Sequence, residues 1–328
     1  MDIEALIKQI FSIEPGDDAA FETVWQQVYT HQRKHNPIYN RYCKVLNIET
    51  RPYLPIEAFK HAPIASFSQE EADLVFQSSG TGKGVRSRHF VRDKAVYEHS
   101  LSTHFCRLLG EGPHTLLAYL PHYQEMGATS SLLYMVEYLV EHYGNEHSGF
   151  FLHREMEIQE NIDASVSAGY PVILFGAAFG LLDLIEKYAM DLPANAVVIE
   201  TGGMKTYRQE ITRDELHHKL AEGVGVDKSQ VWSEYGMCEL LSQCYAQGGA
   251  VFMPPPWMRF EIMNPENPLE RQVDGVAGVL ALIDLANLHS VSAILTQDRA
   301  IQRGEGFEVL GRLSGAELRG CNFLLEKT

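Results

Sequence analysis

Residues 73–84, Asp73-Leu74-Val75-Phe76-Gln77-Ser78-Ser79-Gly80-Thr81-Gly82-Lys83-Gly84, form the stretch that decides the fold. Its apolar start predicts a buried strand, and small hydroxylic residues with one lysine follow immediately. Glycines let a backbone approach a ligand, and successive N–H groups can then form an anion-binding nest. The loop lacks the GxxxxGKS/T spacing of the Walker motif, and alone such a loop is more often a plain mobile connection. Its meaning therefore depends on the rest of the chain.

Downstream of this loop the chain alternates between short apolar strands and amphipathic helices. Strands are expected at 115–120, 171–175, 196–199 and 231–232, helices at 132–143 and 180–188, and a capping box at 212–215. This order predicts an α/β fold whose mostly parallel sheet is covered on both faces. Ligands bind beyond the carboxyl ends of such strands. We expect the Ser/Gly loop, Gly202-Gly203 and Tyr235-Gly236 to share that edge.

The two ends of the chain have different patterns. Near the N-terminus, apolar residues recur at helical spacing from Phe21 to Tyr29, with Asp17 or Asp18 as a possible cap. From Pro254 onward the helical signal fades, and strands are expected at 278–285 and 306–313. We therefore expect a helical lead-in before the α/β region and a smaller β-rich lobe after it.

Composition limits the function. The 328 residues are 45% hydrophobic, enough for a large core, and the net charge of −16 disfavours nucleic acid as a partner. No apolar run approaches the roughly 20 residues that span a bilayer. Acidic residues near Met1 do not fit a signal peptide, so a cytoplasmic location is the default expectation. The five cysteines include no CxxC pair, which disfavours a disulfide framework or a zinc ribbon.

A second strong feature is Ser233-Glu234-Tyr235-Gly236-Met237-Cys238-Glu239-Leu240. An aromatic ring can stack on a purine, and a nearby carboxylate can hold Mg²⁺ against phosphates. Taken alone, the stretch is more typical of a strand-to-helix junction with a surface glutamate. Its value also depends on the other motifs.

Together these motifs resemble the adenylate-forming (ANL) superfamily of acyl-CoA synthetases, adenylation domains and luciferases. The family's SSGTTGKPK-like loop corresponds to residues 78–83, and its YGxTE motif to residues 235–239. Gly202-Gly203 stands where the family has its adenine-side glycines, Thr296-Gln297-Asp298 resembles TGD, and Gly311-Arg312 resembles the GR before the hinge. These motifs occur in the family's order from residue 74 onward.

Within the superfamily the chain is most similar to the acyl-protein synthetase (LuxE-type) branch, which activates fatty acids. The stretches with that similarity are 54–60, 120–123, 239–243, 255–257 and 319–321. The resemblance implies an adenylate-forming large domain over 1–313 and a hinge-like tail over 314–328. The large domain would divide into a helical lead-in (1–60), α/β sheets (61–250) and a β-rich lobe (251–313).

The resemblance also implies ATP and Mg²⁺ as cofactors and a role for each site residue. Ser78, Ser79, Thr81 and Lys83 would hold the β- and γ-phosphates, on a backbone that includes Gly80 and Gly82. Tyr235 would stack on adenine beside Gly202, Gly203 and Gly236. Glu239 would bind Mg²⁺, Asp298 would accept hydrogen bonds from ribose, and Arg312 would lie near ribose or phosphate. His122 would line the acyl pocket beside Tyr235, although a purely structural histidine is an equal alternative.

Three features depart from the family pattern. The Ser/Gly loop is shorter, with one threonine and no proline, and Cys238 replaces a threonine that can touch the α-phosphate. The given chain stops at Thr328, where the resemblance leads us to expect no mobile C-terminal domain and no adenylation lysine from it. The acyl-protein synthetases are also short, so this length fits that branch.

Cys321 is the candidate nucleophile because Arg319 nearby favours the thiolate. A thiolate could attack an acyl-adenylate and form a thioester, although an ordinary thiol on a late strand is an equal alternative. Lys83, Glu239, Cys321 and His122 are thus the expected catalytic residues, with Cys238 in the nucleotide-binding set. The expected partners are a carboxylic acid and a thiol acceptor, which is Cys321, CoA or a carrier protein, within a possible enzyme complex. An AMP-forming acyl- or aryl-CoA ligase and a non-catalytic nucleotide-binding homologue remain alternatives.

Overall fold

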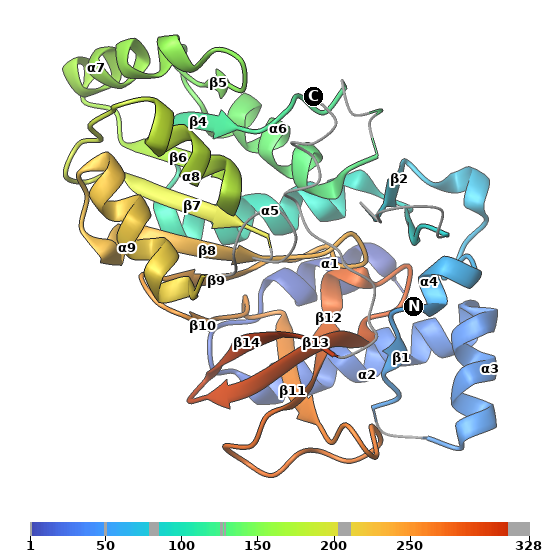
Figure 1. The fold of residues 1–328 in the computed structure, drawn as a ribbon. Helices are drawn as coiled ribbons and strands as arrows, with labels where there is room; N and C mark the ends of the chain where they lie inside the picture. The colour runs from blue at the N-terminus through green and yellow to red at the C-terminus, as the bar shows by residue number, and fades with distance from the viewer. Residues whose placement is uncertain are drawn as a thin grey trace.

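The computed structural model describes residues 2–48, 51–78, 85–124, 127, 129–202 and 211–313. Its upper layer is the predicted parallel sheet, in the order β5-β4-β6-β7-β8-β9 (Figure 1). The strands are β4 (Thr115–Tyr119), β5 (Gly149–Phe150), β6 (Val172–Ala177), β7 (Val197–Thr201), β8 (Val231–Tyr235) and β9 (Cys244–Gln247). All neighbours pair parallel except β8 and β9, which run antiparallel. The α/β prediction is therefore confirmed.

Helices cover both faces of this sheet, as the unbroken apolar strands require. They are α5 (Lys94–Leu109), α6 (Ser131–Tyr143), α7 (Ile158–Ala168), α8 (Ala178–Lys187) and α9 (Arg213–Val224). In β4, Leu116 and Ala118 face the core shared with α5 and α6. Leu117 faces the opposite core, which contains residues of α7, α8 and α9. The period of two along the strand thus divides the hydrophobic residues between two cores.

The lower layer, the β-rich layer, is a second sheet whose main path of strands is antiparallel (Figure 1). Its path β10-β14-β13-β12-β11 contains β10 (Val251–Phe252), β11 (Met258–Met263), β12 (Gly278–Asp284), β13 (Ala293–Arg303) and β14 (Gly306–Arg312). The short strand β1 (Leu54–Pro55) pairs parallel with β13. The sequence did not predict β13, because its polar residues, Gln297 and Asp298 among them, interrupt the apolar pattern.

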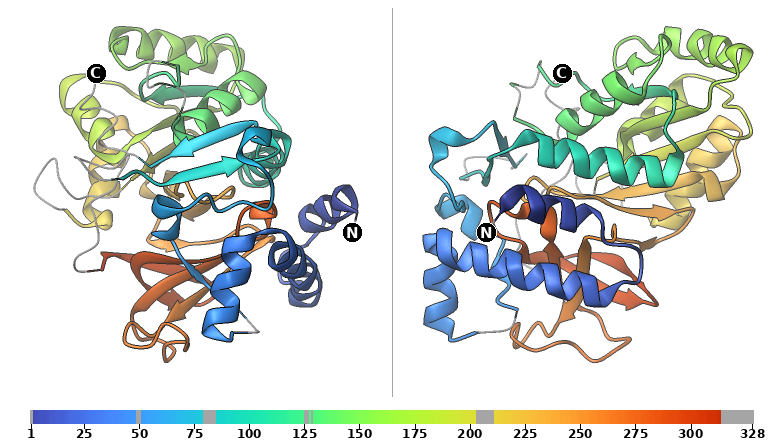
Figure 2. Two further views of the ribbon diagram at one scale, coloured as in Figure 1. Left: turned by 90° about the vertical axis from the view of Figure 1, so that its right-hand side faces the viewer. Right: turned by 180° about the vertical axis from the view of Figure 1, so that it is seen from behind.

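The N-terminal region consists of helices, and the second of them contacts this second sheet through Asp18 and Arg259. They are α1 (Ile3–Phe11), α2 (Asp18–His35), α3 (Pro37–Leu46) and the short α4 (Ala58–His61). As predicted, an aspartate caps α2: the Asp17 side chain accepts from the Ala20 N–H at 2.9 Å. The view from behind shows α1 and α2 crossing in front of the β-rich strands (Figure 2). The buried Gln32 side chain fixes this contact by donating to the Asn287 carbonyl at 3.0 Å.

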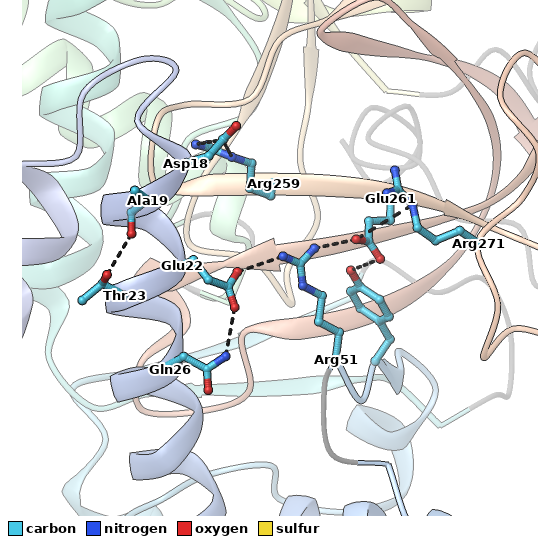
Figure 3. Close-up of polar contacts among 10 residues, drawn as sticks. Asp18, Ala19, Glu22, Thr23, Gln26, Arg51, Arg259, Glu261 and Arg271 are labelled. Atoms are coloured by element: carbon cyan, nitrogen blue, oxygen red, sulfur yellow. Dashed lines mark hydrogen bonds and ion pairs between the residues drawn. The ribbon is translucent and has the colours of Figure 1, made fainter.

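A cluster of charged side chains ties α2 to β11. Arg51 lies between Glu22 and Glu261, with N–O distances of 2.9 and 2.5 Å (Figure 3). The Tyr53 hydroxyl donates to the second oxygen of Glu261 at 2.8 Å. This cluster joins the lead-in to the β-rich sheet through one nearly buried carboxylate.

The remaining described strands correct one sequence-based expectation. Strand β2 (Leu74–Gln77) pairs only with β3 (Arg88–Val91), and the pair is antiparallel. Of the predicted buried strand 74–76, only Phe76 is fully buried. The Ser/Gly loop therefore connects a hairpin and does not follow a strand of the parallel sheet, because so short a connection returns the chain antiparallel.

Four 3₁₀ turns complete the described elements: η1 (Gln69–Glu71), η2 (Glu155–Glu157), η3 (Lys228–Gln230) and η4 (Leu285–Asn287). Thr212 caps α9, as the capping-box pattern predicted, by accepting from the Glu215 N–H at 3.1 Å. Among the helices that the structure describes, none has both the length and the apolar character needed to cross a membrane.

Candidate active site

At the base of the Ser/Gly loop, Ser78 and Ser87 are joined by two hydrogen bonds. Ser78 donates its N–H to the Ser87 carbonyl at 3.2 Å, and its hydroxyl accepts from the Ser87 N–H at 3.1 Å. Ser78 is buried, so its hydroxyl holds the hairpin together. The other predicted phosphate-loop residues, Ser79, Gly80, Thr81, Gly82 and Lys83, lie outside the described residues.

His89 connects this hairpin to the 235–239 motif. Its Nδ1 lies 2.8 Å from the Cys238 carbonyl, and its Nε2 lies 3.1 Å from the Ser290 hydroxyl. A carbonyl can only accept, so Nδ1 carries the proton and Nε2 of the neutral ring accepts from Ser290. Burial lowers the pKa of His89 to about 4, which keeps the ring neutral. The hairpin and the motif are thus fixed to each other by an uncharged side chain.

The motif loop is also held from the β-rich layer. Asn287 donates to the Glu239 carbonyl at 2.9 Å. The Asp284 carboxylate accepts from the Leu241 N–H at 2.9 Å and from the Ser242 hydroxyl at 2.7 Å. Burial raises the pKa of Asp284 to about 6, against the effect of these hydrogen bonds. The backbone around Glu239 therefore has fixed partners in both layers.

Glu239 is the predicted Mg²⁺ ligand, and its side chain is fully buried beside His89. Elsewhere in the described part of the chain, no group of three or more His, Cys, Asp or Glu side chains converges as a metal site. A single carboxylate fits Mg²⁺, which takes one or two protein oxygens and completes its shell with phosphates and water. The donor chemistry of Glu239 is thus suitable for that ion, whereas Cys238 adds only a buried thiol behind it.

Tyr235, Asp298 and Arg312 meet where the two sheets join. The Tyr235 hydroxyl donates to Asp298 Oδ2 at 2.8 Å, and Arg312 Nε lies 3.2 Å from Asp298 Oδ1. Burial and the Asp298 charge raise the pKa of Tyr235 well above its usual value, so its hydroxyl remains a donor. Residues that are 63 and 77 positions apart in the sequence are therefore brought into one polar cluster, since β13 and β14 pair at Asp298 and Arg312.

Aromatic rings surround this cluster. The Tyr235 ring lies 5.6 Å from the rings of both Phe252 and Phe307, measured between centroids. The Arg213 guanidinium lies over Phe252 at 4.8 Å from the ring centroid. Phe252 and Phe307 are buried and form an aromatic wall behind Tyr235, whose part-exposed ring is the one that suits stacking on a flat ring such as a purine.

Polar residues that the sequence analysis missed lie behind this wall. The Ser233 hydroxyl donates to the buried Glu200 carboxylate, and His217 Nε2 lies 3.0 Å from the same hydroxyl. Arg213 Nε lies 3.7 Å from Glu200. The position of Ser233 and Glu200 near strand ends was visible in the sequence, but their pairing depends on the parallel register of β7 and β8.

Glycine is required at two positions beside Tyr235, for a different structural reason at each. Gly202 follows β7 with φ of 101°, a conformation that residues with a side chain rarely adopt. Gly236 has no positive φ, but a Cβ there would lie 2.5 Å from Glu234 Oε1. Gly203 lies outside the described residues, as does Cys321.

His122 lies apart from the other described site residues. Its ring packs 4.9 Å from the Phe150 ring, and its Nε2 lies 3.3 Å from Glu137 Oε1. It follows β4, which β6 and β7 separate from β8 and Tyr235 in the sheet. The structure thus gives His122 partners at the β5 edge and shows no contact with Tyr235.

Solved structures share this fold. A 2-hydroxyisobutyryl-CoA ligase in an open conformation, in complex with 2-HIB-AMP and CoA, superposes with a TM-score of 0.67 at 12% identity, covering 91% of this chain and 70% of that one. The same ligase in the postadenylation state with 2-HIB-AMP gives 0.67 at 13% identity, covering 97% and 74%. ATP-bound MatB from Rhodopseudomonas palustris gives 0.54 at 14% identity, covering 75% and 49%, so this chain spans about half of MatB. The fold is that of adenylate-forming ligases.

The sequence comparison is more specific than the structural one. No curated protein matches the chain. The family model described as "Acyl-protein synthetase, LuxE" matches residues 14–328, nearly the whole sequence. The resemblance found from the motifs is thereby confirmed, and the chain belongs to the acyl-protein synthetase (LuxE) family.

Proposed function

We propose that this protein uses ATP to activate a carboxylic acid, of the fatty class that its family resemblance implies, and passes the acyl group to a thiol. The observation that carries the proposal is the Tyr235–Asp298–Arg312 cluster beside an aromatic wall, in a chain of this family. A carboxylate held by a tyrosine and an arginine can accept hydrogen bonds from the hydroxyls of a ribose. The part-exposed ring of Tyr235, backed by the buried Phe252 and Phe307, would offer the stacking surface for its base.

In the first step the acid's carboxylate oxygen attacks the α-phosphorus of ATP. The bond from that phosphorus to the bridging oxygen breaks, pyrophosphate leaves, and an acyl-adenylate remains. The protein contributes placement and charge stabilisation, which together account for most of the rate in such phosphoryl-transfer chemistry. Glu239 would hold the Mg²⁺ that neutralises the phosphate charge. Lys83 and the hydroxyls of Ser79 and Thr81 would bind the leaving phosphates, whereas the buried Ser78 hydroxyl holds the base of their loop by accepting from the Ser87 N–H.

In the second step a thiolate attacks the acyl carbon of the adenylate. The bond between that carbon and the AMP oxygen breaks, AMP leaves as an anion, and a thioester forms. The family resemblance supports Cys321 as the thiol, with CoA or a carrier-protein thiol as the alternative acceptor. A partner enzyme would then remove the acyl group from the thioester.

The first experiment measures acid-dependent exchange of labelled pyrophosphate into ATP, with Mg²⁺ and a panel of fatty and aromatic acids. The proposal predicts exchange that requires one of the acids. Absence of exchange with every acid, with Mg²⁺ and candidate partners present, would overturn it in favour of a nucleotide-binding protein without this activity.

The second experiment addresses the acceptor. Labelled acid and ATP should leave label on denatured wild-type protein and none on Cys321→Ser, with Cys244→Ser as a matched control that retains it. Cys244 is a suitable control because burial raises the pKa of its thiol well above the usual value. Equal label on Cys321→Ser would exclude Cys321 as the acceptor.

A further inference from the structure

Glu234 is a buried carboxyl group that the proposed chemistry does not use. It precedes Tyr235 on β8, and only 8% of its surface is exposed. Its Oε2 accepts a hydrogen bond from the Thr201 hydroxyl of β7, whose Cα is its register partner. Within the described part of the chain, Oε1 has no hydrogen-bond partner. Solvent reaches this oxygen, so a hydrogen-bond donor of a ligand can take the place of water there.

The free oxygen points toward the motif loop. Gly236 is exposed, and Glu234 Oε1 occupies the space that a side chain at Gly236 would need. Successive residues of a strand point to opposite faces. Tyr235 turns toward Asp298, so Glu234 turns toward the α5–α6 side of the sheet. Glu234 thus lies next to the nucleotide cluster but on the other face of β8.

A row of apolar side chains, called the seam below, continues from Glu234 on that face of the sheet. Tyr245 of β9 is the register partner of Glu234 and lines a cavity together with Ile199, Phe175 and Phe105. The cavity volume is only about 10 Å³, roughly the space of one water molecule. The seam is therefore closely packed, and Glu234 lies beside it through its register partner Tyr245 without lining it.

We infer that Glu234 determines specificity for the acid: its free oxygen accepts a hydrogen bond from a hydroxyl or amino group that the substrate carries near its carboxylate. The inference rests on the proposed function, because it places the acid between the α5–α6 face and the nucleotide. The acid's carboxylate must reach the α-phosphate beside Tyr235 and Gly236, so a substituent close to that carboxylate comes next to Glu234. The apolar remainder of the acid faces the seam.

The groups around Glu234 provide no positive charge to its carboxyl group. Burial raises the pKa of Glu234 to about 7, opposed by the Thr201 hydrogen bond and reinforced by the charge of Glu200. The other titratable groups that face it are Tyr97, Tyr245 and Cys244, whose pKa values are all raised well above usual by burial. None of them supplies a positive charge, which leaves that role to a donor from the ligand.

The test compares matched acids in the pyrophosphate-exchange assay. Butanoic and octanoic acids are each measured beside their 2-hydroxy, 3-hydroxy and 3-amino forms, with wild type and Glu234→Gln. A site built around a hydrogen bond discriminates strongly against the analogue that lacks the group, so we expect kcat/KM to favour one substituted acid by about tenfold or more. In Glu234→Gln the amide keeps the hydrogen bond with Thr201 but presents an N–H donor to the substrate. The ratio of kcat/KM between the substituted and the plain acid should therefore fall to about one.

The two chain lengths and three substituents separate the possible outcomes. Exchange with equal kcat/KM for plain and substituted acids in wild type would overturn the inference and leave the proposed function standing. So would a Glu234→Gln enzyme that is slower with every acid but keeps the wild-type preference, since that result indicates a structural role only. Absence of exchange with any acid would overturn the proposed function and this inference together.

Discussion

A tyrosine, a carboxylate and an arginine meet twice in this molecule, in regions with different roles. At one place the Tyr235 hydroxyl donates to Asp298, which also faces Arg312. At the other the Tyr53 hydroxyl donates to Glu261, which also faces Arg51 (Figure 3). Both tyrosine hydroxyls lie 2.8 Å from their carboxylates. A tyrosine–carboxylate–arginine cluster is therefore not by itself the mark of an active site.

The surroundings distinguish the two clusters. The first lies at the carboxyl end of a parallel strand, between Gly202 and Gly236 and against an aromatic wall. The second joins α2 to β11, and its arginine already faces a second carboxylate, Glu22. We therefore assign the first cluster to ligand binding and the second to stability, and each assignment can be tested separately.

Replacing Asp298 by alanine should have the largest effect. Two ribose hydroxyls would lose a charged acceptor, and each hydrogen bond is worth about 1.5–3 kcal/mol, so kcat/KM for ATP in pyrophosphate exchange should fall by about 100-fold or more. The measurement is exchange at varied ATP, with circular dichroism to confirm the fold. A folded variant within threefold of wild type would contradict the assignment.

His89 lies inside the site region, and we expect it to contribute to the free energy of unfolding. Its pKa falls from 6.5 to about 4 on folding. Below pH 6.5 the His89 ring takes up a proton in the unfolded chain but stays neutral in the folded protein. The contribution of His89 to the free energy of unfolding is therefore complete above pH 6.5 and is lost as the pH falls toward 4. The loss should reach about 3 kcal/mol, at about 1.4 kcal/mol per pH unit.

Denaturant unfolding from pH 7 to pH 4 measures this contribution as the difference between wild type and His89→Gln. The wild-type free energy of unfolding should fall more steeply by that slope. Parallel curves for the two proteins would show that His89 is not held neutral by the fold.

Replacing Glu261 by glutamine should lower stability and leave catalysis unchanged. The amide cannot pair ionically with Arg51, and only 10% of the Glu261 side chain is exposed, so unfolding should become easier by about 1–2 kcal/mol. Urea unfolding gives the stability and pyrophosphate exchange gives the control. A fall in exchange equal to that of Asp298→Ala would remove the distinction between the clusters.

The smallest expected effect comes from a matched pair of tyrosine substitutions. Tyr235→Phe and Tyr53→Phe each remove one hydrogen bond worth about 0.5–1.5 kcal/mol. The first should raise KM for ATP about two- to tenfold, because Asp298 loses a positioning partner, and the second should change only the unfolding free energy. Identical kinetic effects of the two substitutions would contradict the comparison.

Much of this arrangement could be predicted from local sequence. Unbroken apolar strands and helical periodicity predicted the parallel sheet, and the family resemblance implied that Tyr235, Asp298 and Arg312 belong to one nucleotide site. The hairpin of β2 and β3 was missed, because a three-residue apolar run does not reveal its pairing partner. His89 and Arg213 were also missed, because their roles arise from contacts with Cys238 and Phe252, far away in the chain.

The central claim is that an acyl-adenylate forms, and oxygen transfer tests it most directly. The acid is supplied with ¹⁸O in its carboxylate, with ATP, Mg²⁺ and the protein, and the AMP released after thioester formation is analysed by mass spectrometry. The attacking carboxylate oxygen stays with phosphorus when the acyl carbon is transferred, so the account predicts AMP that carries one ¹⁸O atom. AMP without ¹⁸O, or ADP as the product, would contradict it.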